Sequence, residues 1–324
     1  MVNIADNILD LIGGTPLVRL NRVIDDVSAS IIAKLEFMNP GGSLKDRIAK
    51  NMIEAAQSDG DLLTGQSIVA AVRPDKQSEH KGIIIEPTGG NTGVSLALVA
   101  AAKGYKLKLA MPDTVSTERK NLLKAYGADL IFTEGGSGMG GAVKKAEELE
   151  LEDSNYFMPQ QFKNPANPEA HKITAKEIWD DTDGLVDVVV CGVGTGGTIT
   201  GIAEYLKAKN PDILMVAVEP SESAVISGEE PMPHGIAGLG AGFIPPILKK
   251  QFVDETIKIS TNDAFIFTKR LANEEGILAG ISSGAVLCGG LQVAKREENK
   301  DKMIVLILPD SGERYLDKPV FNDS

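Results

Sequence analysis

The chain has 324 residues, about twice the length of an ordinary domain, so we expect two domains or one large α/β unit with an additional lobe. Acidic residues exceed basic residues by 45 − 33 = 12, and the excess is spread along the chain, which makes nucleic acids and anionic membrane surfaces poor partners. With 43% hydrophobic and 24% charged residues, a chain of this length is neither disordered nor a small disulfide-stapled protein.

The cysteines and histidines give no sign of a disulfide or a metal site. Cys191 and Cys288 lie in apolar runs far apart in the sequence, which is typical of buried cysteines in a reducing compartment. The three histidines have no partner at metal-ligand spacing, so we expect no metal. The first 14 residues contain two aspartates and no basic residue, unlike a secretory signal, and no apolar run approaches the ~18 residues of a membrane span. We therefore expect a cytoplasmic protein.

Short apolar runs alternate with helical patterns through most of the chain. The predicted strands, in chain order, cover residues 31–35, 83–85, 107–111, 130–133, 186–191, 214–218 and 303–308. The predicted helices cover residues 45–57, 92–103, 117–126, 140–149, 170–180, 199–209, 263–275 and 283–296. Strands that are apolar throughout and alternate with helices indicate parallel sheets covered on both faces. The segment 66–81 ends in polar and charged residues and is predicted to be a surface insertion.

Polar, glycine-rich loops follow three of the predicted strands. They cover residues 86–93 (EPTGGNTG), 192–198 (GVGTGGT) and 309–312 (PDSG). Because ligands bind at the carboxyl ends of parallel strands, we expect the three loops to converge on one edge and to form a site there.

The loop 192–198 predicts a phosphate site. Gly192, Gly194 and Gly197 match the pattern G-x-G-x-x-G between a strand and a helix, and Glu219 closes the next strand, where a dinucleotide site has an acid for the ribose. A tight turn alone is a weaker explanation, since four glycines and two threonines in seven residues exceed what a turn needs. Glycines let backbone N–H groups approach any phosphate at a helix N-terminus, so this pattern alone leaves an NAD-dependent oxidoreductase open.

Four segments, taken together and in this order, resemble the fold-type-II pyridoxal-phosphate enzymes. They are 41–47 (GGSLKDR), 87–93 (PTGGNTG), 194–198 (GTGGT) and 280–284 (GISSG). Four more are similar to the cysteine synthase (O-acetylserine sulfhydrylase) family: 12–20 (IGGTPLVRL), 159–168 (PQQFKNPANP), 241–245 (AGFIP) and 312–316 (GERYL). In motif order, the resemblance runs from about residue 7 to residue 321.

The resemblance implies an α/β fold with two parallel-sheet-centred domains and the cofactor in the cleft between them, as in tryptophan synthase β-like proteins. It implies a larger phosphate-binding domain made of residues 1–48 and 158–324. Residues 49–157 would form a smaller, mobile, substrate-binding domain that carries the insertion 66–81. A homodimer is expected on the same basis.

The resemblance also implies a cofactor site for pyridoxal 5'-phosphate. Lys45 would hold the cofactor as an internal aldimine and would move the proton at the substrate α-carbon. Asn91 would hydrogen-bond the phenolic oxygen of the cofactor, and Ser282 would face its pyridine nitrogen. The phosphate would be held by an uncharged cradle formed by Gly194, Thr195, Gly196, Gly197 and Thr198.

The substrate site implied by the resemblance departs from the family pattern at two places. The α-carboxylate would be bound by Thr88, Gly89, Asn91, Thr92 and Gln161. Gly89 stands where the family usually has serine, and the segment 234–238 (HGIAG) stands where the family has HKIQG. Restoring a serine at residue 89 is expected to tighten the binding of O-acetyl-L-serine, because it would restore a hydrogen bond to the carboxylate.

The implied reaction is a β-replacement that makes L-cysteine from O-acetyl-L-serine and sulfide. Acetate leaves from the β-carbon, α-aminoacrylate forms, and sulfide then adds to it. Alternatives within the family are cystathionine β-synthase, β-cyanoalanine synthase and an enzyme for another O-substituted serine; a non-catalytic binding homologue and an NAD-dependent oxidoreductase are more distant. In the family, a serine acetyltransferase inserts its C-terminal carboxylate at the substrate site, and the missing hydroxyl at Gly89 predicts weak binding of such a partner.

Overall fold

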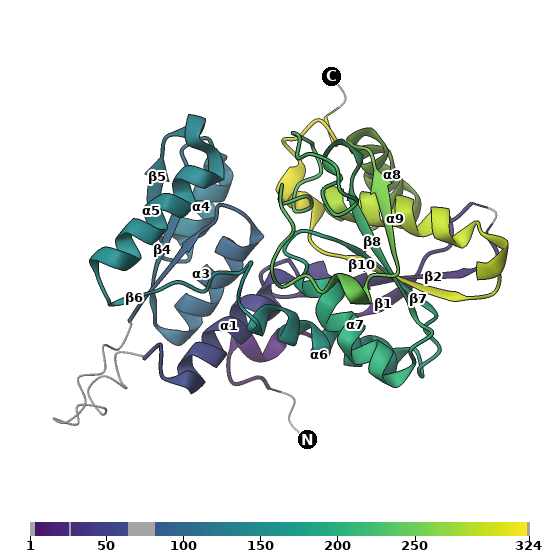
Figure 1. The fold of residues 1–324 in the computed structure, drawn as a ribbon, viewed down its shortest axis with the longest axis horizontal. Helices are drawn as coiled ribbons and strands as arrows, with labels where there is room; N and C mark the ends of the chain where they lie inside the picture. The colour runs from purple at the N-terminus through teal and green to yellow at the C-terminus, as the bar shows by residue number, and fades with distance from the viewer. Residues whose placement is uncertain (1–3, 26, 64–81, 323–324) are drawn as a thin grey trace. The chain divides into compact units, whose positions relative to one another are not determined.

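The computed structural model describes residues 4–25, 27–63 and 82–322, which fall into two compact units (Figure 1). Unit 1 comprises Met1–Ile12 and Lys45–Ala166, and unit 2 comprises Gly13–Leu44 and Asn167–Ser324. Each unit contains its own sheet and its own hydrophobic core. The predicted insertion 66–81 lies outside the described residues.

Unit 1 is built on a four-stranded parallel sheet with the order β5-β4-β3-β6. Its strands are β3 (Ile83–Pro87), β4 (Lys106–Pro112), β5 (Asp129–Thr133) and β6 (Tyr156–Phe157). Its helices are α1 (Lys45–Asp59), α3 (Asn91–Lys103), α4 (Thr117–Ala125) and α5 (Gly138–Glu152), with 3₁₀ turns η1 (Ile8–Leu11) and η3 (Gly135–Ser137).

Both faces of the unit 1 sheet are buried, because alternate residues of each strand point to opposite faces. Ile84 and Leu109 pack in one cluster with apolar residues of α1 and α3. Their neighbours Ile85 and Ala110 pack on the other face with Ala142 and Ala146 of α5. This double coverage explains why residues 83–85 of β3 are all apolar rather than alternating.

Unit 2 is built on a six-stranded sheet with the order β1-β2-β10-β7-β8-β9, parallel except for the β1–β2 pair. Its strands are β1 (Leu17–Arg19), β2 (Ser30–Leu35), β7 (Val188–Gly192), β8 (Leu214–Pro220), β9 (Glu255–Ile259) and β10 (Met303–Leu308). Its helices are α6 (Ala166–Asp181), α7 (Gly197–Lys209), α8 (Thr261–Glu275) and α9 (Ile281–Ala294). Its 3₁₀ turns are η2 (Glu36–Met38), η4 (Ser221–Ser223), η5 (Lys250–Phe252), η6 (Glu297–Asn299) and η7 (Gly312–Tyr315).

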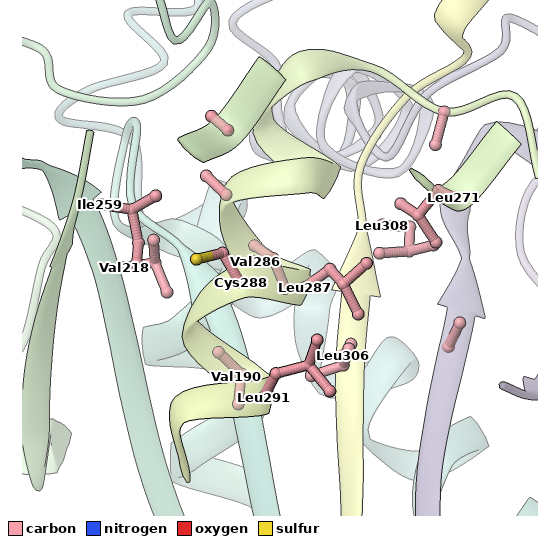
Figure 2. Packing of buried hydrophobic residues seen from close by; sticks show 14 of the residues in the cluster. Val190, Val218, Ile259, Leu271, Val286, Leu287, Cys288, Leu291, Leu306 and Leu308 are labelled. Atoms are coloured by element: carbon pink, nitrogen blue, oxygen red, sulfur yellow. The ribbon is translucent and has the colours of Figure 1, made fainter. Parts of the chain in front are cut away.

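Helix α9 lies at the centre of the larger core of unit 2. Figure 2 shows Leu287 and Leu291 of α9 among the side chains of β7, β8 and β10. A Cβ added at Gly290 would lie 2.4 Å from Leu306 Cδ2, so glycine is what lets this helix approach the sheet closely. The opposite face of the sheet is covered by α6 and α7. None of the helices in the described ranges is long and apolar enough to cross a membrane.

All of the predicted strands and helices are present, with ends within four residues of the prediction. The sequence patterns missed β1, β6 and β9, which are edge strands of at most five residues. The expectation that the three glycine-rich loops share one sheet edge is wrong. The loops after β7 and β10 belong to the unit 2 sheet, whereas the loop after β3 belongs to the unit 1 sheet.

Candidate active site

Each sheet has one position where the strand order reverses, and the predicted phosphate loop and carboxylate-binding residues follow strands at these positions. In unit 2, the chain proceeds from β7 outward to β8 and β9, while β10 lies on the other side of β7. In unit 1, the chain proceeds from β3 outward to β4 and β5, while β6 lies on the other side of β3. In open parallel sheets, ligands bind at such reversals, outside the carboxyl ends of the strands.

The unit 2 reversal carries the predicted phosphate loop, which leads from β7 into α7. The N-cap of α7 is Gly196, with φ at +81°, and no side chain caps this helix. By contrast, α4 and α8 are each capped by a serine hydroxyl, from Ser116 and Ser260. The N-terminal N–H groups of α7 and the positive end of its dipole therefore suit an anion.

The glycines of this loop are required by close packing. A Cβ at Gly194 would lie 2.2 Å from Gly238 O, and one at Gly197 would lie 1.9 Å from Asn167 Oδ1. A Cβ at Gly196 would lie 2.7 Å from Leu248 Cβ. The loop therefore presents bare backbone, without a charged side chain, and this cradle fits the phosphate of pyridoxal 5'-phosphate.

Helix α6 holds both threonines of the loop. Asn167 Nδ2 donates to Thr195 Oγ1 at 3.1 Å, and His171 Nε2 lies 3.2 Å from Thr198 Oγ1. The other ring nitrogen of His171 lies 3.2 Å from Thr174 Oγ1. The sequence interpretation missed Asn167 and His171, although their spacing of four residues places both on one face of a helix.

Ser282 lies at the same edge of the unit 2 sheet as the segment that precedes Lys45. Leu44 N donates to Pro309 O at 2.9 Å, and Gly280 N donates to Asp310 O at 2.8 Å. The loop after β10 therefore joins the segment 42–44 to the start of α9, where Ser282 is buried. Tyr315 Oη donates to Asp310 Oδ2 at 2.6 Å and fixes this loop.

Lys45 is the first residue of α1 and is half-buried, as expected for a functional lysine at the start of a helix. The next residue, Asp46, is fully buried and accepts a hydrogen bond from Ser95 Oγ at 2.5 Å. This contact ties the first turn of α1 to α3 and fixes the backbone that carries Lys45.

The unit 1 reversal brings the predicted carboxylate-binding residues together. Thr88 follows β3, and its Oγ1 accepts from Gly90 N at 3.2 Å, so its hydroxyl hydrogen can donate to a ligand. Thr92 Oγ1 donates to Gln161 Oε1 at 2.6 Å, which orients the Gln161 amide with its nitrogen as the donor end. Asn91 begins α3, whose N-cap is Gly90 and which has no side-chain cap. These groups together can hold a carboxylate without an arginine.

Gly89 is tightly enclosed. A Cβ at this position would lie 2.8 Å from Val115 Cγ2 and 3.4 Å from Met111 Cβ. Arg119 Nη1 donates to the Gly89 carbonyl oxygen at 3.3 Å and holds the loop from the side of α4. The side chain of Val115 therefore occupies the space that a side chain at residue 89 would need.

Glu86, the residue before Pro87 at the end of β3, was not singled out from the sequence. It is buried, and its carboxylate accepts from Gln160 N at 2.9 Å and from Gln161 N at 3.1 Å. Burial raises the pKa of Glu86 to about 7, against the opposing effect of these two hydrogen bonds. The available signal was a carboxylate that ends the otherwise apolar run 83–86.

Glu219 does not serve a dinucleotide. Its Oε2 accepts from Ile226 N at 2.8 Å, and its Oε1 accepts from Ser227 N at 3.0 Å and from Ser227 Oγ at 2.5 Å. Both carboxylate oxygens thus organise the loop after β8, which gives Glu219 a structural role.

The two cysteines are buried and free, and neither is an activated nucleophile. Burial raises the pKa of Cys191 far above its usual range and raises the pKa of Cys288 to about 11. Both thiols are therefore protonated at neutral pH and pack as small apolar side chains.

Comparison with known proteins identifies relatives over almost the whole chain. The profile of the family described as "Pyridoxal-phosphate dependent enzyme" matches residues 8–310. A cysteine synthase of Staphylococcus aureus is 50% identical over 319 residues, which cover 98% of this chain and 97% of the relative. The crystal structure of a cysteine synthase from Entamoeba histolytica matches with a TM-score of 0.91 at 45% identity, covering 99% of this chain and 93% of that one. A hydrogen sulfide-producing enzyme of Fusobacterium nucleatum matches with a TM-score of 0.88 at 42% identity, covering 98% of this chain and 99% of that one. The chain therefore belongs to the family of pyridoxal-phosphate dependent enzymes.

Proposed function

We propose that this protein makes L-cysteine from O-acetyl-L-serine and sulfide by a pyridoxal-phosphate dependent β-replacement. The observation that carries the proposal is the 50% identity to a cysteine synthase over 98% of the chain. The phosphate cradle of unit 2 and the carboxylate loop of unit 1 support it, because they supply donors for the two anionic groups that this reaction must hold.

The cofactor, when bound, supplies an electron sink for the negative charge that develops at the substrate α-carbon. The loop 194–198 would anchor its phosphate, and Asn91 and Ser282 would hydrogen-bond its ring. A serine hydroxyl at the pyridine nitrogen carries no charge, so it does not force that nitrogen to be protonated. This favours elimination of a β-substituent over transamination.

Lys45 is the proposed catalytic residue. Its amine would hold the cofactor aldehyde until the substrate amine replaces it, and it would then remove the proton from the substrate α-carbon. After acetate has left the β-carbon and sulfide has added there, Lys45 would return the proton to the α-carbon. The α-carboxylate would be held by the Thr88 hydroxyl, the N–H groups of residues 89–92 and the Gln161 amide.

The remaining expectations belong to the same proposal. Unit 2 would bind the cofactor phosphate and unit 1 would bind the amino-acid substrate. The protein would act as a homodimer in the cytoplasm, where the free cysteines Cys191 and Cys288 would remain reduced. A serine acetyltransferase would bind weakly, because the carboxylate loop lacks the family's serine hydroxyl at Gly89.

The test is a spectrum followed by an assay. The purified protein should be yellow, and addition of O-acetyl-L-serine should change its visible absorbance before sulfide is added. Sulfide should then yield L-cysteine and restore the spectrum. Lys45→Ala should lose the absorbance and the turnover while its far-ultraviolet circular dichroism stays unchanged. Turnover by Lys45→Ala at the wild-type rate would exclude the proposed mechanism, and faster turnover of another O-substituted serine would change the substrate.

A peptide titration tests the partner. A peptide with the C-terminal isoleucine of a serine acetyltransferase should bind with a Kd weaker than about 1 µM, followed by the fluorescence of the cofactor. Tighter binding would show that the hydroxyl missing at Gly89 is not needed for this interaction.

A further inference from the structure

Glu86 closes a continuous set of contacts that ends at the carboxylate loop. Its two oxygens accept from two consecutive backbone groups, Gln160 N at 2.9 Å and Gln161 N at 3.1 Å. Gln161 in turn accepts from Thr92 Oγ1 at 2.6 Å, and Thr92 lies in the first turn of α3. Two side chains thus connect the segments at the reversal between β3 and β6. Glu86, in β3, binds the backbone of the segment after β6, and Gln161, in that segment, binds Thr92 of α3.

The segment that Glu86 holds is in an unusual conformation. Gln160 has φ at +54°, which non-glycine residues rarely adopt. Its carbonyl oxygen accepts from Lys163 N at 2.8 Å and from Asn164 N at 3.0 Å, so the turn is fixed on its other side as well. Conformations of this kind persist only where surrounding groups determine them, and they cluster at functional sites.

No cationic side chain among the described residues forms an ion pair with Glu86 to offset its burial. Besides the two backbone N–H groups, the charged group that influences it is Glu150 of α5, whose like charge opposes ionisation. A buried carboxylate without a cation costs folding free energy when it is ionised, so packing alone does not account for it.

We propose that Glu86 is a positioning residue for the substrate carboxylate site. It fixes the backbone of residues 160 and 161, so that the side-chain oxygen of Gln161 accepts the hydrogen bond from Thr92. Glu86 touches neither substrate nor cofactor in this role. The inference rests on the proposed function, because it takes Gln161 as a donor to the substrate α-carboxylate.

The chain contains a matched control for this chemistry. Glu219 is also buried at the end of a parallel strand, and it also accepts from two consecutive backbone N–H groups, at Ile226 and Ser227. It lies in β8 of unit 2, and the loop that it holds contains no predicted binding residue. Glu86→Gln and Glu219→Gln therefore make the same chemical change at two sites. Of the two glutamates, only Glu86 is hydrogen-bonded to Gln161.

The experiment is a double-mutant cycle read by equilibrium binding. L-alanine is the ligand, since it has the α-carboxylate but no β-leaving group, and its Kd for the holoenzyme is measured by calorimetric titration. Glutamine keeps the shape of Glu86 but has a single acceptor oxygen, so one backbone N–H would face an NH₂ group. Glu86→Gln should weaken L-alanine binding about tenfold, as expected for the loss of one hydrogen bond to a charged group. Gln161→Ala should weaken it similarly, and the double variant should be no weaker than Gln161→Ala alone.

The Glu219→Gln control should lower thermal stability and leave the Kd of L-alanine within about twofold of the wild-type value. Steady-state kinetics should agree: Glu86→Gln should raise KM for O-acetyl-L-serine more than it lowers kcat. If Glu86→Gln cannot be purified folded, Glu86→Asp serves instead, since it keeps both acceptors but draws them back by one methylene. Glu86→Asp should lower the affinity for L-alanine less than Glu86→Gln does. In a protein that already carries Gln161→Ala, it should lower this affinity no further.

Two results would overturn the inference and leave the proposed function intact. One is wild-type affinity in Glu86→Gln together with weakened binding in Gln161→Ala. The other is a double variant whose loss is the sum of the two single losses. If Gln161→Ala itself bound L-alanine normally, the carboxylate would lie elsewhere, and both the inference and the proposed carboxylate site would fail.

Discussion

Gly89 shows how a single missing side chain can be compensated by a neighbour. From the sequence alone, Gly89→Ser is expected to restore a hydroxyl and tighten substrate binding. The structure changes this expectation, because the new Cβ would lie 2.8 Å from Val115 Cγ2, and valine has few alternative side-chain rotamers. The pair of residues 89 and 115 therefore has to be tested together.

Gly89→Ser alone is expected to leave KM for O-acetyl-L-serine unchanged or higher. Gly89→Ser combined with Val115→Ala should lower KM by more than about tenfold, since a hydrogen bond to a charged group contributes roughly 1.5–3 kcal/mol. Val115→Ala alone is the control, since it opens space without adding a hydroxyl. A single Gly89→Ser variant that already binds tightly would show that Val115 moves aside without cost.

The ionisation of Glu86 should make stability depend on pH. The pKa of Glu86 is about 7 in the folded chain, and its ordinary value, which applies to the unfolded chain, is 4.5. Between pH 4.5 and pH 7, the folded state therefore holds a proton that the unfolded state has released. The free energy of unfolding should therefore fall as pH rises from about 4.5 to 7, by about 3 kcal/mol from this group, and stay at the lower value above. Urea unfolding at pH 5 and pH 8 measures the change, and Glu86→Gln should remove this part of it. An equal pH dependence in wild type and variant would contradict the assignment.

At the scale of the helices, the N-termini of α3, α7 and α9 differ from those of α4 and α8. Helices α4 and α8 begin with a serine that caps them, whereas α3, α7 and α9 begin with glycine and have no side-chain cap. All three of these glycine-capped helices carry predicted binding residues: Asn91 and Thr92 in α3, Thr198 in α7 and Ser282 in α9. Each can therefore use its first N–H groups for a ligand instead of for its own side chain.

Gly196→Ala tests the glycine cap of α7 against a matched site. Both Gly196 and Gly104 have a positive φ, at +81° and +74°, but only Gly196 has a neighbour in the way, Leu248 Cβ at 2.7 Å. Each alanine should cost about 1 kcal/mol through its backbone conformation. Gly196→Ala should also lower the affinity for pyridoxal 5'-phosphate, measured by equilibrium dialysis of the apoprotein, while Gly104→Ala should not. Equal affinity in both variants would show that the loop adapts.

The elements of this fold are largely predictable because their apolar runs are long and continuous. Strand β9 was missed because it is an edge strand with the exposed Lys258 between its two buried isoleucines, so its apolar run is not continuous. Candidate site residues could be predicted only where they stand in a sequence motif or where their contacts are local in the sequence. Glu86 is 74 residues from Gln160, and no periodicity links a carboxylate to backbone groups at that separation. The assignment of the loops to two different sheets also depends on strand order, which spacing alone does not determine.

At the scale of the whole molecule, an ion pair between the buried Lys34 and the partly exposed Glu177 joins the sheet of unit 2 to α6. Lys34 is fully buried on β2, lies 2.8 Å from Glu177 Oε2, and donates to Thr15 O at 2.6 Å. Lys34→Met should destabilise the protein by about 3 kcal/mol, since it leaves carboxylate and carbonyl groups without their partner. Hydrogen exchange should quicken in β2 and α6 and stay unchanged in β3 and β4 of unit 1. A uniform increase across both units would show that this pair stabilises the molecule globally.

The position of β2 beside β10 also affects how the chain is synthesised. β2 is complete at Leu35, but its parallel neighbour begins only at Met303. At about 5–20 residues per second, a ribosome needs roughly 15 to 50 s to cover that interval. Over this time, residues 45–166 can form the whole unit 1 sheet, while the apolar β2 has only the short β1 as a partner. A chain released before residue 303 would therefore hold one folded unit and two apolar strands, β2 and β7, without their shared neighbour. Such unpaired strand edges are what holding chaperones bind and what aggregates in their absence.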